Sequence, residues 1–96
     1  MALTKIGTGR DSALIATGKT DSGWARWEDY PAWATLSAWN QLDLPAGRYR
    51  FEPLGGKIVP YVDGTSAGAV GGVTVLSGQV SLYGYSESTA IITRLA

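Results

Sequence analysis

Turn-forming residues recur at short intervals along the chain, and this spacing is the strongest constraint on its fold. Glycine supplies 13 of the 96 residues, and glycine with proline, aspartate and serine marks turns. The intervals between turns suit short strands better than helices. The turn signals lie at residues 7–9, 18–23, 45–47, 55–56, 63–64, 71–72 and 77–78. The sequence therefore predicts an all-β fold: a small antiparallel β-sandwich or jelly-roll-like barrel of about seven or eight short strands, with little helix.

Between these turns, apolar and polar residues alternate with the period of a strand that is buried on one face. In GRYRFEP, Tyr49 and Phe51 fall on one face, whereas Arg48, Arg50 and Glu52 fall on the other. This alternation predicts a half-buried strand with a charged outer face.

Further strands and connections are predicted in the same way. Residues 45–47 are expected to turn the chain, so that residues 42–44 and 48–52 are consecutive strands. Residues 77–78 are expected to close a hairpin. Pro60 has no N–H to donate, which indicates an edge strand or a bulge. The other expected strands are residues 12–18, 23–29, 57–62, 73–75, 80–83 and 89–96, with a short strand or helical turn at 34–39.

The length of the chain predicts a single domain. We expect this β-sandwich domain to occupy residues 12–96. Residues 1–11 contain Gly7 and Gly9 and have weak periodicity. They predict an N-terminal arm that is disordered alone and becomes ordered on docking. Residues 63–72 are small and predict a flexible loop.

The composition excludes several kinds of chemistry. The chain has no cysteine and no histidine, so it has no disulfide or thiol nucleophile and lacks the commonest general base and metal ligand. Eight basic and eight acidic residues cancel, which leaves no electrostatic footprint for nucleic acid or an anionic membrane. No apolar run approaches the roughly 20 residues of a membrane helix, and the N-terminus does not resemble a signal peptide. We expect a soluble protein made without Sec export.

The sequence contains no catalytic motif. Glu28 and Asp29 are adjacent and would point to opposite faces of a strand, while Asp43 and Glu52 lie on polar strand faces. Solvated or turn-capping roles explain these carboxylates. The glycine-rich residues lack the Lys-Ser/Thr pair of a phosphate-binding loop. We therefore expect no enzymatic activity, no cofactor and no metal site.

All four tryptophans of the chain lie within residues 24–39. Tryptophan buries a large area and is enriched in stable interfaces, so these residues are candidates for the core or a subunit interface. A platform of exposed rings for sugars is the alternative, whereas stacking of bases would also need a positive groove. The candidate partner-binding residues are Trp24, Trp27, Tyr30, Trp33 and Trp39.

Arg48 and Arg50 are second candidates for partner binding, because they share one strand face. Two arginines at this spacing can hold a phosphate or a partner carboxylate. A polar outer face paired with Glu52 or Asp43 is the alternative.

Three stretches together resemble a known kind of protein. GWARWEDY at residues 23–30 and LDLPAGRYRFEP at residues 42–53 are similar to the opening of small jelly-roll-like β-sandwich domains of bacteriophage virion proteins. SGQVSLYGYSESTAIITRLA at residues 77–96 is similar to their closing hairpin. The chain departs from this pattern in its extra tryptophans and in Pro60.

The resemblance implies a non-enzymatic virion structural protein of a tailed phage. It implies a capsid decoration or cement protein that bridges neighbouring subunits of the shell, with a tail or fibre component as the alternative. The implied partners are the major capsid protein or other virion proteins, and copies of the chain itself in a trimer or dimer. The protein would be made in the host cytoplasm and located in the virion. A small carbohydrate-binding module with a tryptophan platform remains the competing hypothesis from the residues themselves.

Overall fold

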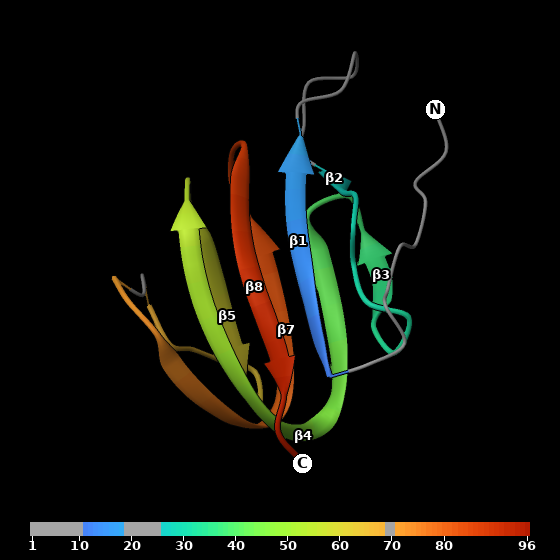
Figure 1. Cartoon of the computed structure of the whole chain (residues 1–96), viewed down its shortest axis with the longest axis vertical. Helices are drawn as coiled ribbons and strands as arrows, with labels where there is room; N and C mark the ends of the chain where they lie inside the picture. The colour runs from blue at the N-terminus through green and yellow to red at the C-terminus, as the bar shows by residue number, and fades with distance from the viewer. Residues whose placement is uncertain (1–10, 19–25, 69–70) are drawn as a thin grey trace.

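The computed structural model describes residues 11–18, 26–68 and 71–96, and within them it is all-β (Figure 1). The all-β fold class predicted from turn spacing is confirmed. The predicted arm at residues 1–11 lies outside the described residues except for Asp11, and so does Trp24. The strands are β1 (Ser12–Gly18), β2 (Arg26–Trp27), β3 (Thr35–Ala38), β4 (Gln41–Gly55), β5 (Ile58–Val62), β6 (Thr65–Ser66), β7 (Thr74–Gly84) and β8 (Ser88–Arg94).

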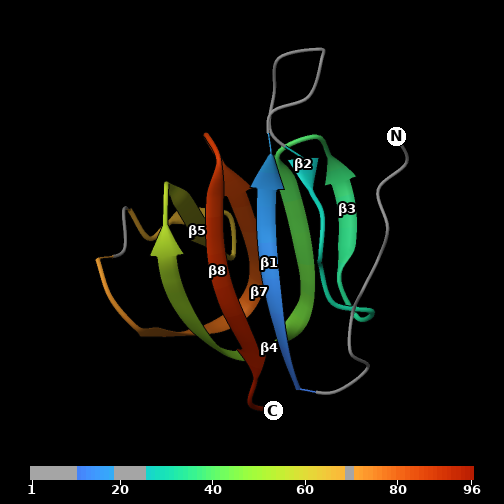
Figure 2. The ribbon, with the colours of Figure 1, turned by 45° about the horizontal axis from the view of Figure 1, so that its top comes forward.

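All strands pair antiparallel in one sheet of order β2-β1-β8-β4-β7-β5-β6, and β3 pairs with the start of β4. The sheet curls over at its lower end, so that two halves face each other (Figure 2). The front half contains β2, β1, β8, the second part of β4 and the first part of β7. The back half contains β3, the first part of β4, the second part of β7, β5 and β6.

The long strands β4 and β7 run through both halves, and they bend where turns had been expected. Residues 45–47 lie inside β4 and residues 77–78 lie inside β7, so the predicted turns at these two places are wrong. The register between the strands shifts between Leu44 and Gly47, and Gly47 is paired with Gly78. Extra residues on one strand make a bulge, which bends and twists the sheet. Turn-forming residues therefore serve here to bend two continuous strands.

The β5–β6 connection is a tight hairpin. Asp63 and Gly64 have φ of 51° and 81°, and two successive positive φ angles between paired Val62 and Thr65 identify a two-residue type I′ turn. The flexible loop predicted at residues 63–72 thus begins with ordered strand pairing. Strand β5 pairs with β7 on one side and with the short β6 on the other, so the edge strand or bulge predicted from Pro60 is wrong.

The core lies between the two halves. Tyr49 and Phe51 are fully buried, which confirms the alternation predicted in β4, and Arg48 on the other face is exposed. From the back half, Leu82 packs into the same cluster as Ile92 from the front half. Each such side chain stabilises the fold by about 1.5–3 kcal/mol on burial. The core thus depends on residues from strands that are distant in sequence.

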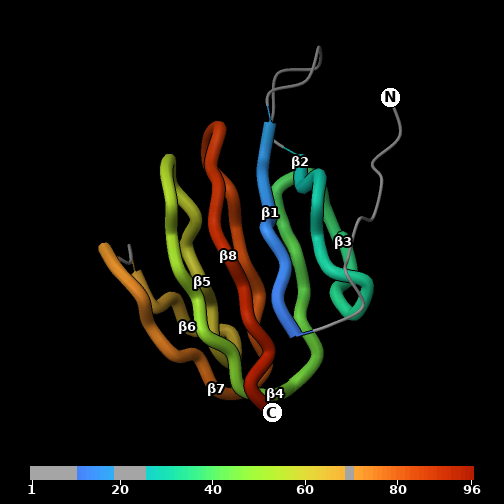
Figure 3. Tube along the Cα trace, in the orientation of Figure 1, coloured from blue at the N-terminus to red at the C-terminus, as the bar shows by residue number. Residues whose placement is uncertain are grey.

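The two halves of the sheet leave one side of the core open, between β2 and β3. The segment that joins these two strands crosses this open side (Figure 3). Pro31 of this segment is buried, and Tyr30 and Trp33 pack against the core. The predicted order of strand, loop and short strand is confirmed here. Of the strand expected at residues 23–29, residues 26–27 form β2, residues 28–29 are not part of a strand, and residues 23–25 lie outside the described residues. At residues 34–39 the structure has a strand, β3, and not a helical turn.

Candidate functional site

Trp27 is a core residue, which corrects its prediction as part of a partner surface. Strand β2 pairs with the end of β1, where Trp27 lies opposite Thr17. Both residues face inward, and Trp27 is fully buried. Within residues 11–18, 26–68 and 71–96, its indole Nε1 has no hydrogen-bond partner. The side chain therefore stabilises the domain and is not available to another molecule.

Trp33 and Tyr30 close the side of the core. The Trp33 ring stacks on Tyr49 with 5.5 Å between centroids and 27° between planes. The guanidinium of Arg94 lies 5.7 Å from the centroid of the Trp33 ring. Burial raises the pKa of Tyr49, and the charge of Arg94 offsets part of that shift. The Tyr49 hydroxyl donates to the carbonyl of Pro45 at the bulge. Trp33 is thus held by structural contacts.

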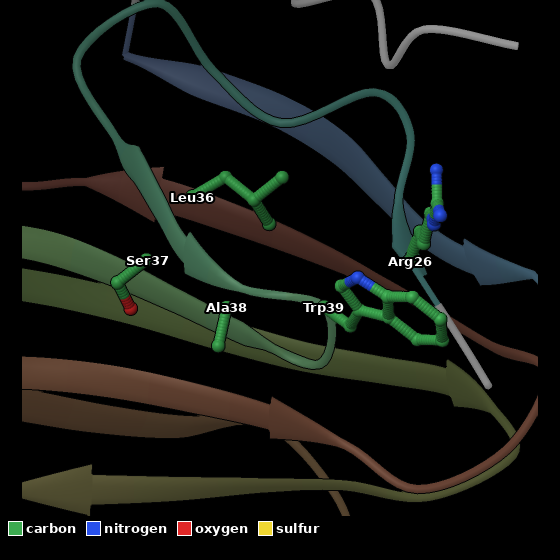
Figure 4. Close-up of a pocket in the computed structure, with 5 residues that line it drawn as sticks. All are labelled: Arg26, Leu36, Ser37, Ala38 and Trp39. Atoms are coloured by element: carbon green, nitrogen blue, oxygen red, sulfur yellow. The ribbon is translucent and has the colours of Figure 1, made fainter.

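Trp39 differs from these aromatics because 44% of it is exposed. It lines an open pocket of about 400 Å³ together with Arg26 from β2 and Leu36, Ser37 and Ala38 from β3 (Figure 4). The guanidinium carbon of Arg26 lies 4.8 Å from the centroid of the Trp39 ring, within the range of a cation–π contact. The structure therefore brings together an arginine and a tryptophan that are separated in sequence.

The backbone fixes the position of Trp39. Trp39 and Asn40 form the turn between β3 and β4, where Ala38 pairs with Gln41. The carbonyl of Asn40 accepts a hydrogen bond from the amide of Gly84 at 2.9 Å, which ties this turn to β7. Because the backbone is held on both sides, the tryptophan ring projects from a rigid base.

Arg26 has unused hydrogen-bonding capacity. Its Nε is buried and has no hydrogen-bond partner among the residues that the structure describes. A guanidinium carries five donors arranged to meet a carboxylate. The pocket thus combines the positive charge of Arg26 with the apolar surfaces of Trp39, Leu36 and Ala38. This combination suits a ligand group that presents a carboxylate beside an apolar side chain.

Asp43 supports the rim of this pocket from the neighbouring strand. Its Oδ1 accepts hydrogen bonds from Ser81 Oγ at 2.8 Å and Gln41 Nε2 at 3.0 Å. Partial burial raises the pKa of Asp43, but hydrogen bonds from Gln41, Ser81 and Ser37 outweigh burial and lower it below its ordinary value. Ser37 lines the pocket, so the ionised carboxylate helps to hold the pocket wall.

This lowered pKa predicts a pH dependence of stability. A carboxylate with a lower pKa in the folded protein contributes stability above its unfolded pKa of about 4, and the contribution is lost as pH falls through the folded pKa. Asp43→Asn should therefore reduce the free energy of unfolding by about 1 kcal/mol or less at pH 7, and the difference from the parent should shrink at pH 3. Urea unfolding at both pH values measures this. A difference that is the same at both pH values would show that the charge of Asp43 is irrelevant.

The two predicted arginines lie away from the pocket. Arg50 forms an ion pair with Glu52 at 3.2 Å, and both side chains are partly exposed. This arrangement matches the alternative of a polar outer face. Arg48 is exposed, and its carbonyl accepts a hydrogen bond from the amide of Leu95 at 2.7 Å. The structure thus does not combine the arginines of β4 with the described aromatic residues of the pocket.

A group of tyrosines on the outer face of the back half was not predicted. The rings of Tyr61 and Tyr83 meet edge to face with centroids 4.8 Å apart. Lys57 Nζ lies 5.4 Å from the centroid of the Tyr85 ring. Burial and the nearby hydroxyls of Tyr61 and Tyr83 raise the pKa of Tyr85. The alternation around Tyr83 was visible in the sequence, but the pairing of β5 with β7 that completes the group was not.

The part of the chain that the structure describes contains neither a metal-binding cluster nor a membrane-spanning helix. No three His, Cys, Asp or Glu side chains there are grouped so that they could hold a metal ion. Residues 11–18, 26–68 and 71–96 also contain no helix that is long and apolar enough to cross a membrane. Comparison with protein-family models, with curated proteins and with solved structures finds no match.

Proposed function

We propose that this chain is a non-enzymatic structural subunit that binds another protein through the Arg26–Trp39 pocket. The observation that carries the proposal is the exposed Trp39 ring, whose centroid lies 4.8 Å from the guanidinium carbon of Arg26 in an open pocket. Tryptophan and arginine dominate the residues that contribute most to protein–protein binding, especially where a partner removes them from water. The pocket is open and has a rigid base, as such an anchor requires.

The narrower form of the proposal is a virion structural protein of a tailed phage, specifically a capsid decoration protein that bridges neighbouring subunits. It is supported by the resemblance of the three sequence stretches and by the all-β fold, which is of the expected class. A tail or fibre component is the alternative assignment. The partner segment would present a carboxylate to Arg26 and an apolar side chain to Trp39.

A sugar platform is the second candidate function, and it now depends on one ring. Trp27 is buried and Trp33 is stacked against Tyr49. Among the residues described, Trp39 is the tryptophan with an open face, beside Ser37 and Arg26 as possible hydrogen-bond donors to a sugar. A single ring favours a protein anchor over the row of rings that binds an extended glycan.

The proposal predicts that Trp39→Ala weakens binding to empty shells assembled from the major capsid protein of the same genome. Loss of a central tryptophan should reduce the affinity by about thirtyfold, which corresponds to about 2 kcal/mol. Co-sedimentation with the shells measures binding, and a change in tryptophan emission on mixing gives an independent signal. The stability of Trp39→Ala should change little, because the ring is partly exposed.

Leu54→Ala is the matched control, because Leu54 is 51% exposed but does not line the pocket. It should bind as the parent does. Binding to tail fractions instead of shells would select the fibre alternative. Quenching of emission by oligosaccharides, with no binding to any virion fraction, would overturn the structural proposal in favour of the carbohydrate-binding module. Equal binding by the parent and Trp39→Ala would show that the pocket is not the docking site.

A further inference from the structure

The first part of β7 is an open edge of the front half of the sheet. Residues 74–78 pair with β4 on one side. On the other side, β5 pairs with β7 only from Val80 to Gly84, and no described strand pairs with residues 74–78. The backbone amides and carbonyls that point outward along this stretch therefore have no strand partner within the described part of the chain.

This edge lacks the features that normally prevent pairing. Edge strands are usually protected by charged side chains, proline or short length. Strand β7 carries no charged side chain over its 11 residues. Val73 and Val75 are 52% and 49% exposed at its start. The sheet ends formed by β2 and β6 are only two residues long each, and β2 carries Arg26. Strand β7 thus presents a longer and more apolar edge than β2 or β6 does.

We propose that a second copy of this chain pairs with the β7 edge about a two-fold axis, so that the front halves of two copies form one continuous antiparallel sheet. Two copies related by a two-fold axis bring the same strand against itself, so any charge there would face a like charge. Residues 74–78 carry none. With the axis near Leu76, Val75 of one copy would lie opposite Ser77 of the other.

The bend in β7 limits the interface to one end of the strand. At Gly78 φ is 127°, and beyond it Gln79 bonds to Asp63 through both its amide and its carbonyl. The free edge therefore ends at Gly78. This edge and β3 lie on opposite sides of the molecule in both orientations (Figures 1 and 2). Pairing through β7 would leave the Arg26–Trp39 pocket open, so this inference does not depend on the proposed function.

Sedimentation velocity from micromolar to millimolar protein tests the inference. We expect a monomer–dimer equilibrium, and Val75→Lys should weaken it by about tenfold or more, because the two lysines would be diagonal neighbours across the axis on the same face of the sheet. Hydrogen exchange should show protection of amides in residues 74–78 that increases with protein concentration in the parent and not in Val75→Lys. Thermal unfolding of both proteins checks that the substitution leaves the fold intact.

Leu14→Lys is the control. Leu14 is also 49% exposed, and it lies on the same outer face of the front half, since Leu14 pairs with Ile91 and Ile91 with Glu52. It is three strands away from the edge in the order β1-β8-β4-β7. Its dimer should be as stable as that of the parent. A monomer throughout, a trimer, a dimer that survives Val75→Lys, or a dimer weakened equally by Leu14→Lys would each overturn the proposal.

Discussion

Replacing Gly56 with alanine is expected to lower the free energy of unfolding by about 3–5 kcal/mol. Gly56 has φ of 74°, which disfavours any side chain. A Cβ at this position would also lie 2.6 Å from the Cα of Ser88, and closer still to the carbonyl oxygen of Glu87. Two contacts with backbone atoms cannot be relieved by rotating a side chain.

The surroundings of Gly56 are tied to it by hydrogen bonds, which explains why the overlap is costly. Ser88 Oγ accepts from the amide of Lys57 at 2.7 Å and donates to the carbonyl of Lys57 at 3.1 Å. These bonds hold the β4–β5 connection against the start of β8. Moving the two segments apart to admit a methyl group would break them, so strain and lost hydrogen bonds add.

Substitutions at two other glycines separate the effect of the positive φ angle from the effect of the close packing. Gly64 has φ of 81° with nothing within 4 Å of a built Cβ, so Gly64→Ala should cost only the conformational strain of about 1–2 kcal/mol. Gly55 has neither feature, and Gly55→Ala should be nearly neutral. Urea unfolding of the three variants measures how much each substitution lowers the free energy of unfolding. Equal losses for Gly56→Ala and Gly64→Ala would refute the close packing of the β4–β5 connection against β8.

Trp27→Ala is expected to have a comparable effect, with a loss of about 3–5 kcal/mol. The side chain is completely buried between the two halves, and truncation leaves a cavity that the rigid strands cannot fill. A domain of this size has a total stability of about 5–14 kcal/mol. The loss therefore corresponds to a fall in Tm of about 15 °C or more.

Trp27→Phe distinguishes volume from polarity at this site. It removes the indole N–H that lacks a partner while keeping an aromatic ring, so it should cost much less than Trp27→Ala. Trp39→Ala provides a second comparison, because that residue is substantially exposed. Thermal unfolding followed by circular dichroism gives all three values. A Trp27→Ala protein that melts like Trp39→Ala would contradict the core position of Trp27.

The sequence was sufficient for the fold class and for the buried face of β4, because both follow from local alternation. It was insufficient at residues 45–47 and 77–78, where turn-forming residues bend continuous strands. The same glycine and proline chemistry serves a hairpin turn and a bulge. Only the pairing of Gly47 with Gly78 shows that these residues form a bulge and not a hairpin turn. That pairing joins positions far apart in the chain, so it has no local sequence signal.

Like the fold, the candidate site was predictable from the sequence only in part. In the strand expected at residues 23–29, the adjacent residues Arg26 and Trp27 fall on opposite faces, but alternation alone does not say which face is buried. That depends on the pairing of β2 with β1. The sequence placed Trp39 among the candidates, yet its contact with Arg26 arises because β2 and β3 lie at the same open side of the sheet. Long-range strand pairing, which has no local signal, decides which aromatic residue is exposed.

The position of β8 in the sheet has a consequence for the order of folding. Strand β8 lies between β1 and β4, and Ala13 pairs with Ile92 near opposite ends of the sequence. During synthesis, β1 must wait for nearly all the following strands before its main partner leaves the ribosome. Such distant pairing is associated with slow folding. The back half can form its contacts earlier, so a nascent chain would carry a partly assembled sheet whose missing central strand is made after both of its neighbours.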